Sequence, residues 1–411
     1  MAGCGAPERA DRPQGGMSED RRMLPYGRQT IEDDDIAAVA AALRSDFLTT
    51  GPLVEEFEKQ FAAASGAKHA VACNSGTAAL HLAAMALRLG PADTAIVPTL
   101  TFLASANAIR MTGAEVFFAD VDPDSGLMTE AAFEEAIALA GKYRREIKAA
   151  VPVHLNGRIC DMRLLSAAAK KHNVALIEDA CHAIGVPGVG ANEYSDFACF
   201  STHPVKTIAT GEGGAVTTKD EAAAHHMRKL RSHGMVHAPE EIRQRDEGFE
   251  NGAKRPWYYE MPEIGWNYRM PDILCALGIS QLKKLDRFIK RREEIARLYD
   301  RLLAPLAPAL KPAPRGNDSH GLHLYAVLID FEKIGTTRAK FMNALRAENI
   351  GTQVHYLPVH RQPYYRDRYG ERELPGADAY YARCLSIPLY PSMRDEDAEY
   401  VAKTLGKLVK G

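Results

Sequence analysis

Residues 69–89 of the chain read HAVACNSGTAALHLAAMALRL. The first five residues of this stretch are mostly small and apolar, which is typical of a short buried strand. From Gly76 onward the residues are apolar nearly all round a helix, so we expect this helix to be buried rather than to lie on the surface. Residues 74–77 lie between the two and are small and mostly polar. The stretch therefore predicts a strand, a tight turn and a buried helix in succession.

The same alternation of short apolar runs and helical patterns continues to residue 232. The expected strands are residues 69–73, 94–97, 115–119, 147–153, 174–178, 197–201 and 213–218. The expected helices are residues 76–89, 102–112, 129–141, 161–172 and 219–232. Strands that are apolar on both faces and alternate with helices are typical of a mostly parallel sheet covered by helices. We predict an α/β fold whose large domain contains a seven-stranded sheet of this kind.

The flanking segments predict a helix before this region and a second domain after it. The first helix is expected from Thr30, whose hydroxyl can cap an acidic first turn, to about Phe47. A single long helix over 272–303 and a proline-rich linker should follow the sheet. The smaller α/β domain should contain strands at 322–330 and 352–356 and helices at 336–349 and 394–409. The predicted division is a disordered leader over 1–22, with Met17 or Met23 as alternative starts, a large domain over 23–280 and a small C-terminal domain over 281–411.

The composition excludes several classes of protein. The chain has 411 residues, 46% of them hydrophobic and 25% charged, so it is neither wholly disordered nor collagen-like. Its formal net charge of -2 gives no basic excess for nucleic acid or an anionic membrane. No apolar run reaches the roughly 18 residues of a membrane span, and the polar leader lacks the apolar core of a signal peptide. The seven cysteines are widely spaced and contain no C-x-x-C pair, which argues against disulfide bonds and against a zinc site. This pattern favours the reducing cytoplasm.

Three motifs that follow predicted strands can carry chemistry. Residues 74–77 (NSGT) open a helix, whose free N–H groups and positive end can bind a phosphate group, or they form only a helix cap. Asp179 follows the strand at 174–178 and either faces a ligand at the sheet edge or caps a helix. Lys206 follows the strand at 197–201, and a lysine in a desolvated site has a lowered pKa and becomes an amine nucleophile. Taken alone, each motif is compatible with a functional role and with an ordinary structural or surface role.

The combination of these motifs points to one cofactor. A phosphate cradle, a carboxylate and a lysine occur at one edge of the predicted sheet, and the aromatic Phe102 follows the strand at 94–97. Pyridoxal 5′-phosphate (PLP) needs a cradle for its phosphate, an amine for its aldehyde and a carboxylate that keeps its pyridine nitrogen protonated. It also needs a flat or apolar surface for its ring. The sequence therefore predicts a PLP site.

Several longer motifs resemble those of a known family. They are NSGTAALHL, PTLTF, EDACHAIG, FSTHPVKTIATGEGG, GWNYRMPD and VHYLPVH. Over about residues 24–411 the chain is similar to the DegT family of nucleotide-sugar aminotransferases, which are PLP-dependent transferases of fold type I. Within that family, stretches such as LRSHG and CALGISQLKKLD are most similar to the branch that acts in pseudaminic acid biosynthesis.

The resemblance implies a role for each candidate site residue. Lys206 would bind the cofactor and move protons, Asp179 would pair with the pyridine nitrogen, and His182 would lie beside the ring near its 3-oxygen. Phe102 would stack on the ring, and Asn267 would reach the phosphate from the partner subunit. The residues implied to bind the cofactor are Ser75, Gly76, Thr77, Phe102, Asp179, His182, Ser201, Lys206 and Asn267. The residues implied to border the substrate are Tyr26, Glu212, His355 and Tyr356.

The resemblance also implies a reaction and an assembly. The amino group of L-glutamate would move to C4 of a UDP-linked 4-keto-6-deoxy-N-acetyl-hexose, and the active unit would be a homodimer. The alternatives are a 3- or 4-keto sugar carried by dTDP or GDP, and a PLP-binding sensor that does not turn over.

Two features depart from the family pattern. Thr202 stands where members often have phenylalanine, and we expect this change to have little chemical effect. Residues 236–262 form a charged segment that is long for a connection. This segment either contacts the nucleotide, with Lys254, Arg255 and Trp257 as candidates, or has no direct role.

Overall fold

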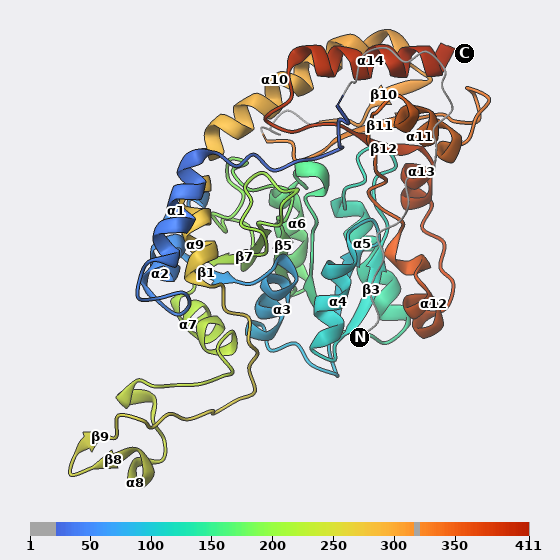
Figure 1. Ribbon diagram of the computed structural model, residues 1–411. Helices are drawn as coiled ribbons and strands as arrows, with labels where there is room; N and C mark the ends of the chain where they lie inside the picture. Colours follow the sequence, from blue (N-terminus) through green and yellow to red (C-terminus); the bar gives the residue numbers. More distant parts are fainter. Residues whose placement is uncertain (1–21, 316–320, 411) are drawn as a thin grey trace, which may run out of the picture.

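The computed structural model of the protein describes residues 22–315 and 321–410 (Figure 1). The disordered leader predicted for residues 1–22 lies outside the described residues, apart from Arg22. A large α/β body carries a C-terminal lobe along one side, and one segment projects from the body as an arm (Figure 1).

The body is built on a seven-stranded sheet, as predicted. Its strands, in spatial order, are β1 (His69–Cys73), β7 (Gly214–Thr218), β6 (Phe197–Ser201), β5 (Ala175–Asp179), β4 (Ile147–Ala150), β2 (Thr94–Pro98) and β3 (Glu115–Ala119). All neighbouring pairs from β6 to β3 are parallel, whereas β7 runs antiparallel to both of its neighbours. The sheet is therefore mixed but mostly parallel, and its parallel strands end at a common edge.

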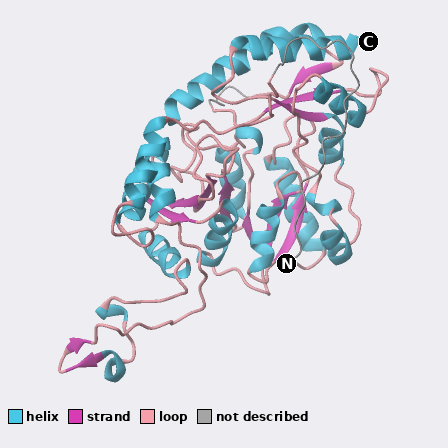
Figure 2. Ribbon diagram, in the orientation of Figure 1, coloured by secondary structure: helices cyan, strands magenta, loops and turns pink. Residues whose placement is uncertain are grey.

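Helices cover both faces of the sheet (Figure 2). They are α3 (Gly76–Ala86), α4 (Leu103–Met111), α5 (Glu130–Lys142), α6 (Met162–Lys171) and α7 (Glu221–Leu230). Alternate residues of a strand face opposite sides, so Val116 and Phe118 of β3 pack in the core with α3 and α4. Phe117 and Ala119 of the same strand pack in the core with α5 and α6. Eight of the 11 residues of α3 are buried, which agrees with the apolar pattern of its sequence.

The N-terminal helices correct two predictions. α1 spans Asp33–Leu43, and Glu32 rather than Thr30 caps it, through a capping box with Asp35. The Thr30 hydroxyl is buried without a hydrogen-bond partner among the described residues. A second helix, α2 (Pro52–Ser65), follows a break and was not predicted. Its proline at the first helical turn is a good helix start, because that position needs no N–H donor.

The long helix predicted over 272–303 is two helices, α9 (Asp272–Leu282) and α10 (Leu285–Leu303). α9 packs against α1 and α2 in the body, whereas α10 packs against α14 (Asp395–Lys410) in the C-terminal lobe. Lys284 lies at the break, and its Nζ is 2.6 Å from Asp34 Oδ1 and 2.7 Å from Asp35 Oδ1. The two halves pack against different parts of the molecule, so a single straight helix does not form.

The C-terminal lobe has its own core and a three-stranded antiparallel sheet. The strands are β10 (Leu310–Pro312), β11 (Tyr325–Ile329) and β12 (Cys384–Ile387). The remaining helices of this part of the chain are α11 (Arg338–Ala347), α12 (Pro363–Tyr369) and α13 (Pro375–Arg383). The strand predicted at 352–356 is wrong, because only Gln353 pairs there, in an isolated bridge with Ser386. Leu24 joins the core of the lobe from the other end of the chain.

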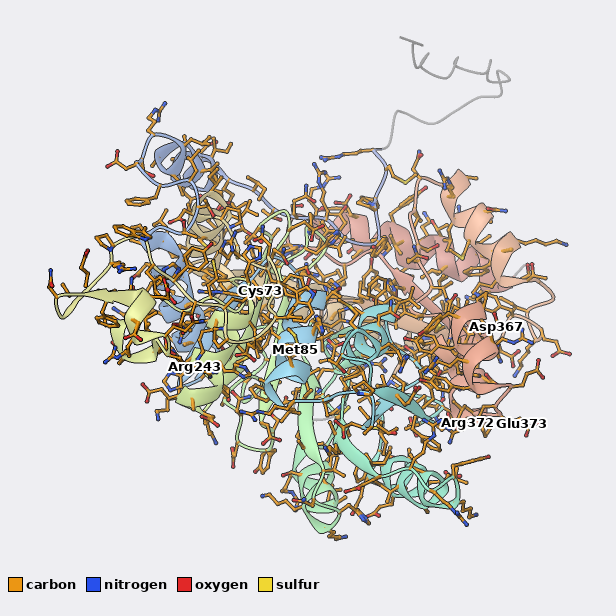
Figure 3. The ribbon with its side chains drawn as sticks, turned by 90° about the horizontal axis from the view of Figure 1, so that it is seen from below. Cys73, Met85, Arg243, Asp367, Arg372 and Glu373 are labelled. Atoms are coloured by element: carbon orange, nitrogen blue, oxygen red, sulfur yellow. The ribbon has the colours of Figure 1, made fainter. Side chains whose placement is uncertain are left out.

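Residues 236–262 form the arm that projects from the body (Figure 1). The arm contains the short elements η2 (Pro239–Glu241), α8 (Arg245–Gly248), β8 (Phe249–Glu250) and β9 (Ala253–Lys254). The Glu260 carboxylate accepts hydrogen bonds from the backbone N–H groups of Arg243 and Gln244, at 2.8 and 2.7 Å. Seen from below, Arg243 lies on the opposite side of the molecule from Arg372 and Glu373 (Figure 3). The segment thus consists of short regular elements joined by loops.

Two further observations concern the described residues as a whole. None of the described helices is both long enough and apolar enough to cross a membrane. The six cysteines that the structure describes are all free thiols, and five of them are buried.

Candidate active site

A cavity of about 560 Å³ opens where the strands of the sheet end and the C-terminal lobe meets the body. Twelve of the thirteen residues predicted for the site line this cavity. They are Tyr26, Ser75, Gly76, Thr77, Phe102, Asp179, His182, Ser201, Lys206, Glu212, His355 and Tyr356. Residues from six separate segments of the sequence are therefore brought together by the fold.

The N-terminus of α3 forms one end of the cavity. Ser75 caps this helix, since its Oγ accepts a hydrogen bond from the Ala78 N–H at 3.1 Å. A Cβ atom at Gly76 would lie 2.8 Å from the Ser201 Cβ and 3.1 Å from the Cys181 Sγ, so only glycine fits there. The positive end of a buried helix, free of side-chain bulk, fits a phosphate group.

Asp179 ends β5 and points into the cavity, with 6% of its surface exposed. Its Oδ2 accepts a hydrogen bond from the Ser105 hydroxyl at 2.6 Å, and its Oδ1 accepts one from the Cys181 N–H at 3.1 Å. Two donors therefore hold the carboxylate in one orientation. A buried carboxylate fixed in this way can pair with a protonated ring nitrogen.

Lys206 lies in the turn between β6 and β7. Burial lowers the pKa of its amine, and the nearby Cys181 and Asp179 oppose this shift. No hydrogen bond or ion pair of the Lys206 Nζ is found in the described part of the chain. A partly buried amine with a lowered pKa and no fixed partner is suited to attack a carbonyl group and to move protons.

His182 lies beside these groups as a neutral imidazole. Burial lowers its pKa well below the usual value, and Lys206 and His355 lower it further. Its Nδ1 accepts a hydrogen bond from the Asn156 N–H at 3.1 Å. We therefore assign the proton to Nε2, which lies 3.2 Å from the Tyr356 hydroxyl oxygen.

The C-terminal lobe supplies the wall opposite the sheet edge. His355 Nδ1 lies 2.8 Å from the Ser386 hydroxyl, and burial lowers the pKa of this histidine to about 3. Its ring packs against Tyr26, with 5.4 Å between the ring centroids. Burial also raises the pKa of the neighbouring Tyr356, so that its hydroxyl stays protonated. This wall presents neutral polar groups, which suit hydroxyl-rich ligands.

Three predicted residues lie at the edge of the cavity or outside it. Phe102 and Glu212 line the cavity but are exposed, with 55% of the Phe102 surface accessible. Asn267 does not line the cavity of its own subunit, and its side chain is exposed. Its backbone carbonyl accepts a hydrogen bond from the Asn74 Nδ2 at 3.2 Å. This position leaves the Asn267 side chain free to face another subunit.

Sequence reasoning missed two residues that shape the site. His323 lines the cavity, is 2% exposed, and lies 4.7 Å from the His182 ring between centroids. No strand end or motif marked it, because it precedes β11 in the C-terminal lobe. Ser105 was missed as the partner of Asp179, although its place three residues after Phe102 on α4 offered a signal.

The cavity fits the cofactor that the sequence predicted. The helix end at Gly76, the fixed carboxylate of Asp179 and the unpaired amine of Lys206 match the phosphate, pyridine nitrogen and aldehyde of PLP. When bound, PLP supplies an electron sink for reactions at a substrate carbon.

Comparison with known proteins agrees with this site. A sequence profile of the DegT/DnrJ/EryC1/StrS aminotransferase family matches residues 29–406. The spore coat polysaccharide biosynthesis protein SpsC of Bacillus subtilis is 42% identical over 396 residues, which span 95% of this chain and 98% of SpsC. PseC of Helicobacter pylori, an aminotransferase of pseudaminic acid biosynthesis, superposes with a TM-score of 0.84 at 28% identity, over 95% of this chain and 100% of PseC. Spr1654 of Streptococcus pneumoniae, in its PLP form, superposes with a TM-score of 0.81 at 25% identity, over 94% of this chain and 99% of Spr1654.

The fold and the cavity define a PLP-dependent transferase of fold type I. The chain belongs to the DegT/DnrJ/EryC1/StrS aminotransferase family, whose members use PLP, and it is a nucleotide-sugar aminotransferase. The predicted similarity to the pseudaminic acid branch is supported only at the level of the family, because identity to PseC is 28% and identity to SpsC is 42%.

Proposed function

We propose that the enzyme moves the amino group of L-glutamate to C4 of a UDP-linked 4-keto-6-deoxy-N-acetyl-hexose. The observation that carries the aminotransferase chemistry is the partly buried amine of Lys206, which has a lowered pKa and lies beside the fixed carboxylate of Asp179. A structural lysine would be paired or exposed, whereas this one faces a cavity large enough for a sugar. A product of this kind is a 4-amino sugar, as in pseudaminic acid biosynthesis.

The residues of the cavity can divide the proton transfers between them. In this buried setting the Lys206 amine can accept a proton from the α-carbon of the donor and deliver one to C4 of the sugar. His182 stays neutral, and its Nε2–H donates a hydrogen bond to the Tyr356 hydroxyl oxygen. The Tyr356 hydroxyl is then free to donate its own proton to an oxygen of the substrate.

The wall at His355 and Tyr356 suits a sugar acceptor. Both groups are neutral and polar, so they can form hydrogen bonds with hydroxyl and keto oxygens. The identity of the nucleotide rests on the resemblance alone. A 3- or 4-keto sugar carried by dTDP or GDP is the second candidate, and turnover with a panel of keto sugars separates the two.

A PLP-binding sensor is the third candidate. Such a protein would keep the cradle at Gly76 and the carboxylate of Asp179 but would not turn over. Conversion of L-glutamate to 2-oxoglutarate by the PLP-loaded protein, without a sugar acceptor, would exclude this candidate. Absence of that half-reaction with any amino donor would favour it.

We further propose that the active unit is a homodimer and that Asn267 acts in the cavity of the partner. Four large apolar side chains in or next to the arm are exposed, which is typical of an interface. They are Trp257, Tyr259, Met261 and Ile264, with exposed fractions of 71%, 54%, 59% and 73%. The cytoplasmic location likewise remains a proposal from the cysteine content.

Mixing two inactive variants tests the shared site. Lys206→Ala removes the amine, and Asn267→Asp places a carboxylate where a phosphate would bind. In a mixed dimer one cavity contains both changes and the other contains neither. Refolding the two variants together should restore about a quarter of the wild-type activity, since half of the dimers are mixed. No recovery on mixing, with dimers present, would overturn the shared site while leaving the reaction untouched.

A further inference from the structure

A buried histidine and glutamate lie directly behind the cavity and have no role in the chemistry described above. His154 Nε2 is 2.8 Å from Glu178 Oε2, and the two residues are 0% and 4% exposed. Neither residue lines the cavity. Glu178 precedes Asp179 on β5, so the two carboxylates point to opposite faces of the sheet.

Each end of the pair is anchored by a further hydrogen bond. The Ser195 hydroxyl donates to Glu178 Oε1, and the Cys160 N–H donates to His154 Nδ1 at 3.3 Å. Since the carboxylate oxygen of Glu178 can only accept, the Nε2 of His154 carries a proton and donates it in a hydrogen bond to Glu178. The pair is thus a hydrogen bond of defined direction between residues that the fold holds in place.

His154 belongs to a loop, residues 152–157 (PVHLNG), which we name the positioning loop. The backbone of this loop is bonded to Asp179 twice. The Asp179 N–H donates to the Pro152 carbonyl at 2.8 Å, and the His154 N–H donates to the Asp179 carbonyl at 3.1 Å. The loop therefore extends the pairing of β4 and β5 as far as the residue whose side chain enters the cavity.

The same loop fixes His182. The Asn156 N–H donates to His182 Nδ1, and the Asn156 backbone has a φ of 64°, in the left-handed region. A Cβ atom at the next residue, Gly157, would lie 2.9 Å from the His182 carbonyl oxygen and 2.7 Å from the Gly321 carbonyl oxygen. The loop is packed too closely to shift without moving the residues that it holds.

We propose that His154 and Glu178 are positioning residues, whose hydrogen bond holds the positioning loop against β5 and so sets the orientation of both Asp179 and His182 toward the cofactor. The inference rests on the proposed roles of Asp179 and His182 at the cofactor ring. It extends them by two residues that touch neither cofactor nor substrate.

The test compares three changes at Glu178 and its anchors in the purified, PLP-loaded protein. Glu178→Leu removes the acceptor, Glu178→Gln keeps an oxygen that can accept from His154, and Ser195→Ala removes one anchor. The readouts are the dissociation constant for PLP, the visible circular dichroism per bound cofactor, which reports how the ring is held, and the melting temperature of the apoprotein. Asp272→Asn is the matched control, since this buried carboxylate accepts from the N–H groups of Gly51 and Leu53 and does not line the cavity.

We expect Glu178→Leu to raise the dissociation constant by about 10-fold, as when outer partners of binding residues are removed, and to weaken the circular dichroism. Glu178→Gln should leave the dissociation constant and the circular dichroism close to the wild-type values. Ser195→Ala should raise the dissociation constant and weaken the circular dichroism by smaller amounts than Glu178→Leu. If Glu178→Leu does not fold, Ser195→Ala serves as the test. Asp272→Asn should lower only the melting temperature.

Two results would overturn the proposal. The first is a Glu178→Leu or Ser195→Ala variant that melts at a lower temperature but binds PLP with unchanged affinity and circular dichroism. The second is an equal effect of Gln and Leu at Glu178, because the hydrogen bond would then not be the cause. Asp179→Asn and His182→Asn show separately whether the site is assigned correctly. If neither of these variants changes the circular dichroism, the proposed site has failed rather than its positioning.

Discussion

The hydroxyl oxygen of Tyr356 lies 3.2 Å from Nε2 of His182, and the two rings are stacked with an interplanar angle of 28°. Tyr356 follows α11 in the C-terminal lobe, whereas His182 follows β5 in the body. This contact therefore joins the two parts of the molecule at the cavity. It also gives the single N–H group of the neutral His182 imidazole a hydrogen-bond acceptor.

Removing the hydroxyl of Tyr356 should weaken catalysis without abolishing it. Tyr356→Phe leaves the His182 proton without its acceptor, and a neutral hydrogen bond contributes about 1 kcal/mol. We expect kcat/KM for the keto sugar to fall by about 5- to 10-fold. Tyr364→Phe is the control, because Tyr364 is 53% exposed and lies outside the cavity, and it should leave the kinetics unchanged. Equal kinetics for the two variants would contradict the role of Tyr356.

Replacing Lys206 should remove activity without destabilising the protein. Among the described residues no other lysine lines the cavity, so turnover of Lys206→Ala should fall by at least ~10³-fold. The melting temperature of the apoprotein should stay the same or rise, because the partial desolvation of the Lys206 amine is no longer required. Lys219→Ala, at an exposed lysine just after β7, should change neither value. A large drop in melting temperature for Lys206→Ala would indicate a structural lysine instead.

A methyl group at Gly76 should block the cofactor cradle. The added Cβ in Gly76→Ala would lie 2.8 Å from the Ser201 Cβ, so α3 or the end of β6 must move. We expect the dissociation constant for PLP to rise by ~10-fold or more, because the helix N–H groups no longer meet the phosphate. Gly90→Ala is the matched control, since a Cβ there meets no atom within 4 Å. Equilibrium dialysis measures the dissociation constants of the two variants. An unchanged affinity for PLP in Gly76→Ala would rule out this phosphate cradle.

Stability should fall as the pH is lowered below the ordinary pKa of histidine. Burial lowers the pKa of His355 to about 3 and that of His81 to about 4, from 6.5, and it also lowers the pKa values of His182 and His323. Below pH 6.5 the unfolded chain binds protons that the folded protein does not, so the free energy of unfolding decreases by up to about 1.4 kcal/mol per pH unit for each group.

Urea unfolding of the apoprotein at pH 7, 6 and 5 measures this slope. His81→Gln should reduce it, since one proton-binding group is removed from the unfolded chain. His237→Gln, at an exposed residue, is the comparison. A free energy of unfolding that does not change between pH 7 and 5 would contradict the neutral, buried state of these histidines.

The sheet could be predicted from the sequence because each strand is a short apolar run with its own boundaries. Strands β1, β3 and β6 have the predicted bounds. The break between α9 and α10 could not be predicted from local pattern, since both halves are good helix sequences and only packing against α1 and α14 separates them. The strand predicted at 352–356 is wrong for a similar reason, because Val354, His355 and Tyr356 line the cavity rather than pair with a strand.

The candidate site could be predicted wherever its residues lie at strand ends. Asp179 and Ser201 end β5 and β6, and Ser75 caps α3 directly after β1. Ser105 and His323 were missed because their importance depends on contacts between distant segments. The Ser105 hydroxyl reaches Asp179 across 74 residues of sequence, and no pattern in either segment records this.

The visible absorbance of the purified protein tests the central claim most directly. After reconstitution with PLP, the account predicts a visible band that is lost in Lys206→Ala and bleaches when L-glutamate is added without a sugar acceptor. A band that does not respond to L-glutamate would point to another donor or to a sensor. Absence of any band that depends on Lys206, even after reconstitution, would contradict the assignment of this cavity as the active site.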